Sequence, residues 1–83
     1  YVETRLAQDA SGRLILQITN PTPLLLVDVV VRVDVQTAQG STRRYDRKLS
    51  RLESGQAQQL LVADDATALT NARAVVLQAR ADS

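Results

Sequence analysis

The feature that most constrains the fold of this chain is the run from Asn20 to Gln36, which opens with two prolines and continues as an alternating valine stretch. Valine occupies every second position from Val27 to Val35, and most of the positions between are polar. A period of two built from β-branched side chains is typical of a strand with one buried face, whereas a helix would scatter these valines around its axis. We therefore predict a long strand over 27–36. Its inner face is predicted to carry Val27, Val29, Val31, Val33 and Val35, and its outer face Asp28, Arg32, Asp34 and Gln36.

The apolar segment Leu24–Val31 overlaps the start of this strand and carries a single charge. A segment with such high β propensity is an aggregation hazard when it is exposed, so we expect it at the centre of a sheet. In the alternative, Leu24, Leu25 and Leu26 stay exposed beside the prolines and form an apolar partner site.

Turn signals divide the rest of the chain into five more short strands. Pro21 and Pro23 lack backbone donors and cannot lie in a central strand, so we expect the chain to cross from one sheet to another at Asn20–Pro23. The other strands are predicted over 1–8, 13–19, 42–49, 56–62 and 72–81, with turns at 9–12, 37–41 and 50–55 and one helical turn within 64–71. The predicted inward residues are Leu14, Leu16 and Ile18 in the second strand, and Val75, Leu77 and Ala79 share one face of the last.

Six strands separated by turns at intervals of roughly 8–12 residues are typical of an antiparallel β-sandwich. We predict an all-β, immunoglobulin-like sandwich of six to seven strands, with a hairpin first and a Greek-key crossover at Asn20–Pro23. The 83 residues form one domain, 1–83. Because the chain has no cysteine or histidine, its stability must come from aliphatic packing and not from a disulfide or zinc.

The same composition excludes several kinds of catalytic site. Without histidine and cysteine, the Ser-His and Cys-His arrangements cannot form. Asp28 and Asp34 share one strand face but lie roughly 20 Å apart at 3.3 Å per residue, too far to share a calcium ion. Arg32 between them is placed to pair with either. We expect no enzymatic activity, no metal site and no cofactor.

The cluster of interest is Arg43–Arg51, which holds five of the ten basic residues. Strand alternation places Arg43, Tyr45 and Arg47 on one face and Arg44, Asp46 and Lys48 on the other. One interpretation, which we favour, is an edge strand protected by charge, with Tyr45 partly covered by arginine stems. The other is contact with an acidic protein, a phospholipid surface or nucleic acid. The candidate partner-binding residues are Arg43, Arg44, Tyr45, Arg47, Lys48 and Arg51.

A second candidate surface is a loop end that combines Asn20–Pro23 with Gln39–Ser41. The net charge of +1 and the presence of only two aromatic residues argue against nucleic acid as the partner. A protein partner is favoured over an anionic lipid surface. The run Leu24–Val27 is far too short to span a membrane, so no transmembrane segment is predicted.

Several segments resemble the bacterial FxLYD-type domains: Leu14–Pro23, the Val27–Val35 strand, Gln39-Gly40 and Leu49–Gln56. The resemblance covers about residues 14–62, and Val31-Arg32-Val33-Asp34-Val35 stands where that family has its aromatic-Leu-Tyr-Asp stretch. It implies an immunoglobulin-like or fibronectin-III-like sandwich in an exported or membrane-anchored bacterial protein, and so a periplasmic or cell-envelope location.

The chain begins at Tyr1 without a methionine, which favours a domain excised from a larger exported protein. The expected function is a non-catalytic interaction or spacer module of a bacterial cell-envelope protein. The alternative is an accessory domain of an envelope enzyme, such as a zinc metalloprotease, whose catalytic residues lie outside this chain.

Overall fold

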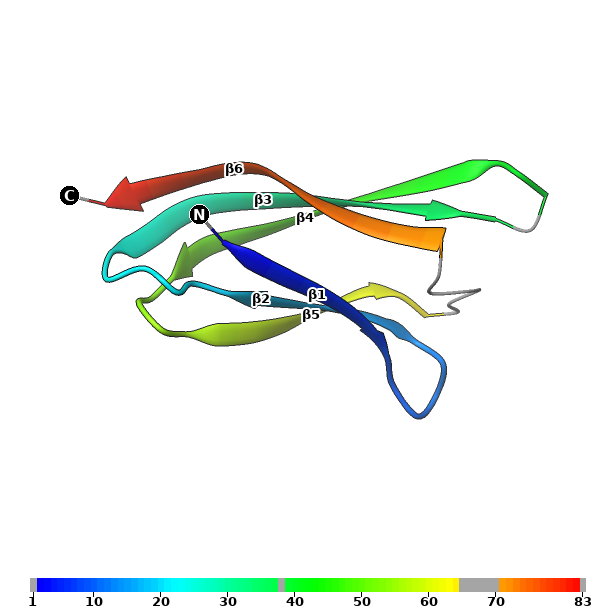
Figure 1. Cartoon of the computed structure of the whole chain (residues 1–83), viewed down its shortest axis with the longest axis horizontal. Helices are drawn as coiled ribbons and strands as arrows, with labels where there is room; N and C mark the ends of the chain where they lie inside the picture. The colour runs from blue at the N-terminus through cyan, green and yellow to red at the C-terminus, as the bar shows by residue number, and fades with distance from the viewer. Residues whose placement is uncertain (1, 38, 65–70, 83) are drawn as a thin grey trace.

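The chain forms two antiparallel three-stranded sheets that pack face to face, as the computed structural model in Figure 1 shows. The structure describes residues 2–37, 39–64 and 71–82. The sheet orders are β1-β2-β5 and β4-β3-β6, which confirms the all-β prediction and gives a sandwich-like arrangement. The strands are β1 (Glu3–Gln8), β2 (Leu14–Thr19), β3 (Leu25–Gln36), β4 (Thr42–Leu52), β5 (Ala57–Ala63) and β6 (Ala72–Asp82).

The first two strands form the predicted hairpin, in a register that pairs Glu3 with Thr19 and Gln8 with Leu14. Asp9 builds its turn: one carboxylate oxygen accepts hydrogen bonds from the backbone N–H groups of Ser11 and Arg13, both at 2.9 Å. These hydrogen bonds, the one from Arg13 first, lower the pKa of the Asp9 carboxyl below its usual value.

The chain then passes from one sheet to the other through residues 20–24, which confirms the crossover predicted at the prolines. β3 lies at the centre of its sheet, between β4 and β6. Leu24 is 50% exposed and precedes the strand, whereas Leu26 is buried, so the apolar segment is split between the crossover and the sheet centre. The buried core consists of Leu14, Leu16, Ile18, Leu26, Val29, Val31, Val33, Val35, Leu49, Leu52 and Val62.

The prediction for β3 is correct from Val29 onward and wrong at Val27. Leu26, not Val27, is buried, and the buried positions then resume at Val29. The cause is Asp28, whose φ of 52° lies in the left-handed region and interrupts the alternation. The inner face of β3 therefore changes parity at Asp28.

The same change of parity runs through the two neighbouring strands. In β4 the buried residues are Leu49 and Leu52, three positions apart. In β6 the register with β3 is irregular at Gln78, and the residues packed on the core are Ala72, Ala74, Val76 and Ala79. The predicted face of Val75, Leu77 and Ala79 is therefore wrong: Val76 points inward, opposite Val31, and Leu77 is 47% exposed.

The end of the fourth predicted strand also changes. β4 continues through Ser50, Arg51 and Leu52, where the sequence predicted a turn, because the strand remains paired with β3 as far as Leu26. The turn that follows is correspondingly shorter. Most of the predicted 64–71 connection, with its helical turn, lies outside the described residues.

The molecule is elongated, about 45 by 24 by 17 Å, and its strands run along the long axis (Figure 1). Successive strands alternate in direction, so β1 starts and β6 ends toward the same end of the sandwich, which we call the proximal pole. The residue 20–24 crossover lies at this pole, and the loop around Gly40 lies at the other, distal pole. The predicted joint surface of Asn20–Pro23 with Gln39–Ser41 is therefore wrong, because the 12 residues of β3 separate the two loops.

Candidate interaction surface on strand β4

The basic cluster lies on β4, which forms one edge of its sheet, as the charge-protected-edge interpretation expects. β4 pairs with β3 along its whole length, from Gln36 opposite Thr42 to Leu26 opposite Leu52. The alternation predicted around Tyr45 is confirmed, since Tyr45 packs on the core while Arg44 and Asp46 point to the outer face. The two faces of β4 therefore carry different interactions.

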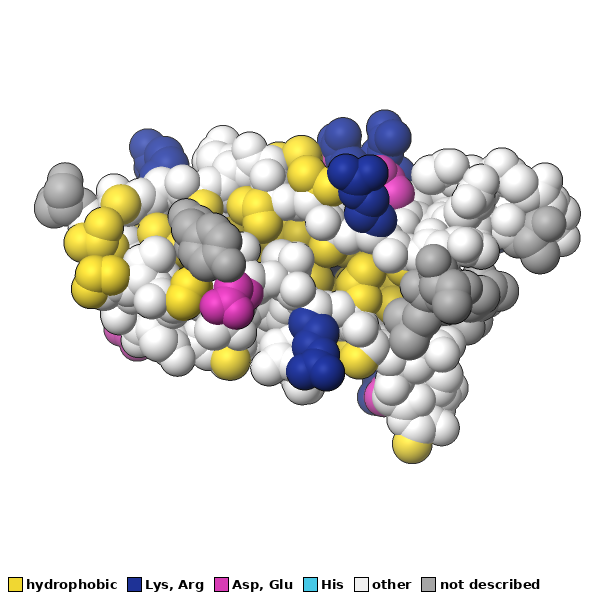
Figure 2. Space-filling model, viewed as in Figure 1, with side chains coloured by type: hydrophobic (Ala, Val, Ile, Leu, Met, Phe, Trp, Pro, Cys, Tyr) yellow, Lys and Arg dark blue, Asp and Glu magenta, His cyan; other side chains and the backbone are white. Residues whose placement is uncertain are grey.

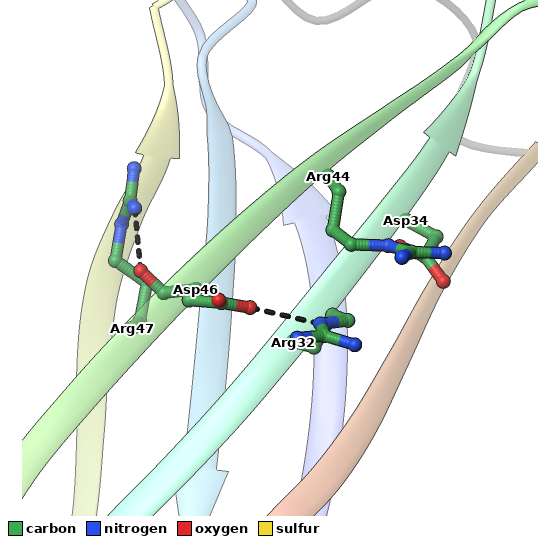
Figure 3. Close-up of polar contacts among 5 residues, drawn as sticks. All are labelled: Arg32, Asp34, Arg44, Asp46 and Arg47. Atoms are coloured by element: carbon green, nitrogen blue, oxygen red, sulfur yellow. Dashed lines mark hydrogen bonds and ion pairs between the residues drawn. The ribbon is translucent and has the colours of Figure 1, made fainter.

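On the outer face, two ion pairs cross from β4 to β3 (Figure 3). Arg44 Nε lies 2.9 Å from Asp34 Oδ1, and Arg32 Nε lies 3.0 Å from Asp46 Oδ1. Each pair joins residues that are directly opposite in the β3–β4 register. The expectation that Arg32 pairs with Asp28 or Asp34 is thus wrong, because a cross-strand neighbour is closer than a residue on the same strand.

These contacts shift the pKa values of both members of the Arg32–Asp46 pair. The hydrogen bond from Arg32 lowers the pKa of the Asp46 carboxyl, and the positive charges of Arg32, Arg44 and Lys48 act in the same direction. The same hydrogen bond raises the pKa of Arg32. The outer face is thus an array of compensated charges.

Arg47 points the other way, toward β5 in the facing sheet (Figure 3). Its guanidinium donates hydrogen bonds to the backbone carbonyl oxygens of Leu61 at 3.0 Å and Val62 at 2.6 Å. A third bond, at 2.8 Å, goes to the carbonyl of Asp46. The guanidinium also lies 5.7 Å from the centre of the Tyr45 ring, within range of a cation–π contact. Arg47 therefore links the two sheets along the β4–β5 side.

The remaining cluster residues differ in how they are engaged. Arg51 pairs with Glu53 at 3.2 Å. Arg43 and Lys48 are exposed, and neither forms a salt bridge or side-chain hydrogen bond with the described residues. Arg43 lies at the distal pole, directly after the Gly40 loop. Of the six candidate residues, Arg43 and Lys48 thus retain the most capacity to contact a partner.

Lys48 borders a shallow hollow of about 420 Å³ on the outer face. It is lined by residues of all three strands, at the level where the sheet changes parity. Asp28 contributes the left-handed bend, and Gln78 Nε2 donates a hydrogen bond to the Asp28 carbonyl at 3.1 Å. The Gln78 amide and the Asp28 carbonyl at this hollow are thus hydrogen-bonded to each other.

Asn20, which the sequence placed in a candidate loop surface, is instead the one buried polar side chain of the described residues. Its Nδ2 donates to the carbonyl oxygens of Leu24 at 2.7 Å and Leu52 at 2.9 Å, and its Oδ1 accepts from Thr22 N and Oγ1. Its backbone bonds Gln56 and Gly55. Asn20 therefore joins the crossover to the β4–β5 turn. The signal was an Asn between a strand and a proline, with Thr two residues on.

Within the described part of the chain, no three or more Asp or Glu side chains cluster as metal ligands would. The same residues include no helix of the length and apolarity that a membrane span needs. Comparison with known proteins found no matching family model, no matching curated protein and no matching solved structure.

Proposed function

We propose that this chain is a non-catalytic interaction module of a larger bacterial cell-envelope protein, built as an immunoglobulin-like sandwich. The observation that carries the proposal is that the chain ends and the candidate binding loops lie at opposite poles of the molecule. Both ends of the described chain lie toward the proximal pole, and the loops that contain residues 9–13 and Gly40 lie at the distal pole of a molecule about 45 Å long. A module attached in this way presents its distal loops to a partner.

The strand order supports the immunoglobulin-like part of the proposal. In immunoglobulin sandwiches, strands A, B and E share one sheet and C and F lie in the other, with C′ added beside C in variable-type domains. β1, β2 and β5 take the places of A, B and E, and β4, β3 and β6 those of C′, C and F. Loops at one end of such sandwiches are their common binding sites.

The chemistry of the distal pole favours a protein partner with an acidic surface. The loops there consist of small and polar residues, and Arg43 beside them is exposed without an ion pair to any described residue. Arg73 in β6 lies at the same pole, directly opposite Asp34 of β3. Asp34 is already paired with Arg44, so it does not neutralise Arg73. Two arginines are thus available at this end.

Site-specific photo-crosslinking tests this proposal. A photoreactive residue replaces Ser41 in the distal loop, and a matched variant carries it at Ala57, at the proximal start of β5; both positions are exposed. In envelope fractions of the source bacterium, the Ser41 variant is expected to form one discrete protein adduct that weakens with Arg43→Glu. Equal labelling from both positions, or no adduct from Ser41, would contradict the proposal.

A further inference from the structure

We propose that a second copy of this chain pairs with strand β6, edge to edge and antiparallel, so that two sandwiches share a continuous six-stranded sheet. β6 is an 11-residue strand that ends its sheet; among the described strands it has a partner, β3, on one side only. Its free edge presents unpaired backbone N–H and C=O groups, which are a template for another strand. This inference does not rest on the proposed distal-pole contact, although Arg73 lies at both surfaces.

The other edges of the sandwich are protected in ways that β6 is not. β4 carries six charged side chains in its 11 residues, and the β5 carbonyls of Leu61 and Val62 are occupied by Arg47. β1 is short, with six residues. β6 has instead an uncharged centre, Ala74–Gln78, without glycine or proline. Of the four edges, β6 is the most competent to accept a strand.

The core is also incompletely covered on this side. Every fully buried hydrophobic residue belongs to β2, β3, β4 or β5, and none of the described residues of β1 or β6 is fully buried. β1 and β6 face the viewer in Figure 1, and Figure 2 shows hydrophobic side chains exposed along the seam between the two layers. The inward side chains that remain part-buried there are Val2, Leu6, Ala72, Ala74, Val76 and Ala79.

The irregularity at Leu77 and Gln78 determines which register a second β6 would adopt. Gln78 lies opposite the outward-facing Val30, so Leu77 and Gln78 both point away from the core. The positions of β6 that face the core are therefore 72, 74, 76, 79 and 81. One antiparallel register matches inner with inner and outer with outer at every position from 73 to 82. It places Val76 opposite the partner's Ala79. Shifting it by one or two residues breaks this match.

The same register is complementary in charge. It places Arg73 opposite the partner's Asp82, and the two-fold symmetry repeats this pair at the other end. A shift by two residues in one direction would instead set Arg73 against the partner's Arg80. Arg73 and Asp82 are both exposed and form no salt bridge with the described residues of their own chain. Pairing would also cover Val76 and Ala79 with their symmetry-related counterparts.

Sedimentation velocity of the 83-residue chain, from about 5 to about 500 µM, tests the inference. The expected result is a concentration-dependent shift from the mass of one chain to that of two. Arg73→Asp and Asp82→Arg each place like charges opposite one another twice, and each is expected to weaken dimerisation about tenfold or more. The double variant R73D/D82R restores opposite charges and should return the dissociation constant to within about threefold of the original.

Arg43→Asp is the matched control, because Arg43 is an exposed arginine on the opposite edge of the same sheet. It should leave dimerisation unchanged, and thermal unfolding of each variant checks that the single chain still folds. A chain that stays monomeric over the whole concentration range would overturn the inference. So would dimerisation that is insensitive to the single substitutions, or that the double variant fails to restore.

Discussion

Asn20 shows how a single polar side chain can organise the interior of a sandwich whose described residues include no other buried polar side chain. Its side chain is fully buried, at 0% exposure, yet both polar atoms are bonded. The partners come from the crossover and from the end of β4, where Leu52 lies 32 residues after Asn20 in the sequence. Ser54 strengthens the same junction by donating to the Thr22 carbonyl at 2.6 Å.

Replacing Asn20 with alanine should therefore lower the free energy of unfolding by about 2–4 kcal/mol, because buried backbone carbonyls lose their donors. Asn71→Ala is the matched control: Asn71 is exposed, and its substitution should change stability by less than about 0.5 kcal/mol. Urea denaturation measures both. Equal stability of the two variants would mean that Asn20 does not hold the junction.

Asp28 is the second residue whose effect exceeds its size, because its φ of 52° sets the parity change of β3. Valine is strained in that region, so Asp28→Val should destabilise the fold by roughly 1–3 kcal/mol. Asp34→Val removes the same charge and a comparable surface ion pair from a regular position of the strand, and should stay within about 0.5 kcal/mol. If the thermal unfolding of the two variants coincided, the bend at Asp28 would not be a constraint.

At the scale of elements, β4 uses its arginines to hold the structure together in two directions. Arg44 pairs within the sheet, whereas Arg47 reaches across to the edge of β5. Arginine suits the second role, since its planar guanidinium presents several donors at once and also lies over the Tyr45 ring.

Arg47→Ala should consequently lower the free energy of unfolding by about 1 kcal/mol or more, because two β5 carbonyls lose a charged donor. Arg44→Ala, which removes the same type of side chain from an exposed ion pair, should cost less than about 0.5 kcal/mol. Chemical denaturation of the two variants at one pH compares them directly. A larger loss for Arg44 than for Arg47 would contradict the inter-sheet role.

The β3–β4 ladder predicts a particular pH dependence. The pKa of Asp46 is lowered from its usual 3.8 by Arg32, so the ionised carboxylate stabilises the fold above that pH, and this contribution is lost as the pH falls through the lowered value. NMR titration should give a pKa for Asp46 below 3.8, and Arg32→Gln should return it toward 3.8. Arg44→Gln, which removes a weaker influence, should change it less. An unchanged pKa in the Arg32 variant would contradict the assignment.

Seen as a whole molecule, much of the architecture could be predicted from alternation and turn chemistry alone. The strands, the hairpin, the crossover and the inner residues from Val29 to Val35 follow from those patterns. The exchange of Val27 for Leu26 could not be predicted, because a left-handed aspartate inside a valine run leaves no local signature. The face of Val76 depends on the same bend transmitted across β3, which is a property of the assembled sheet.

For the candidate surface, too, local sequence patterns predicted which face each side chain lies on but not which residues it contacts. Alternation correctly separated Arg47 from Arg44, but the targets of the two side chains lie on other strands and could not be read from the sequence. The sequence therefore predicted the two faces of the basic strand but not their contacts, and the structure engages most of its charges in contacts within the chain. Among the described residues, those still open to a partner lie at the distal pole, beside Lys48 and on the free edge of β6.

We conclude that fully buried side chains close the core along β4 and β5, whereas only part-buried side chains cover it along β1 and β6. Native-state hydrogen exchange of the single chain, at a concentration below that of dimerisation, tests it most directly. We expect the strongest protection in the central strands β2 and β3, with the amides on the free edge of β6 exchanging much faster than those paired with β3. Uniform protection along both edges of β6, equal to that of β3, would contradict it.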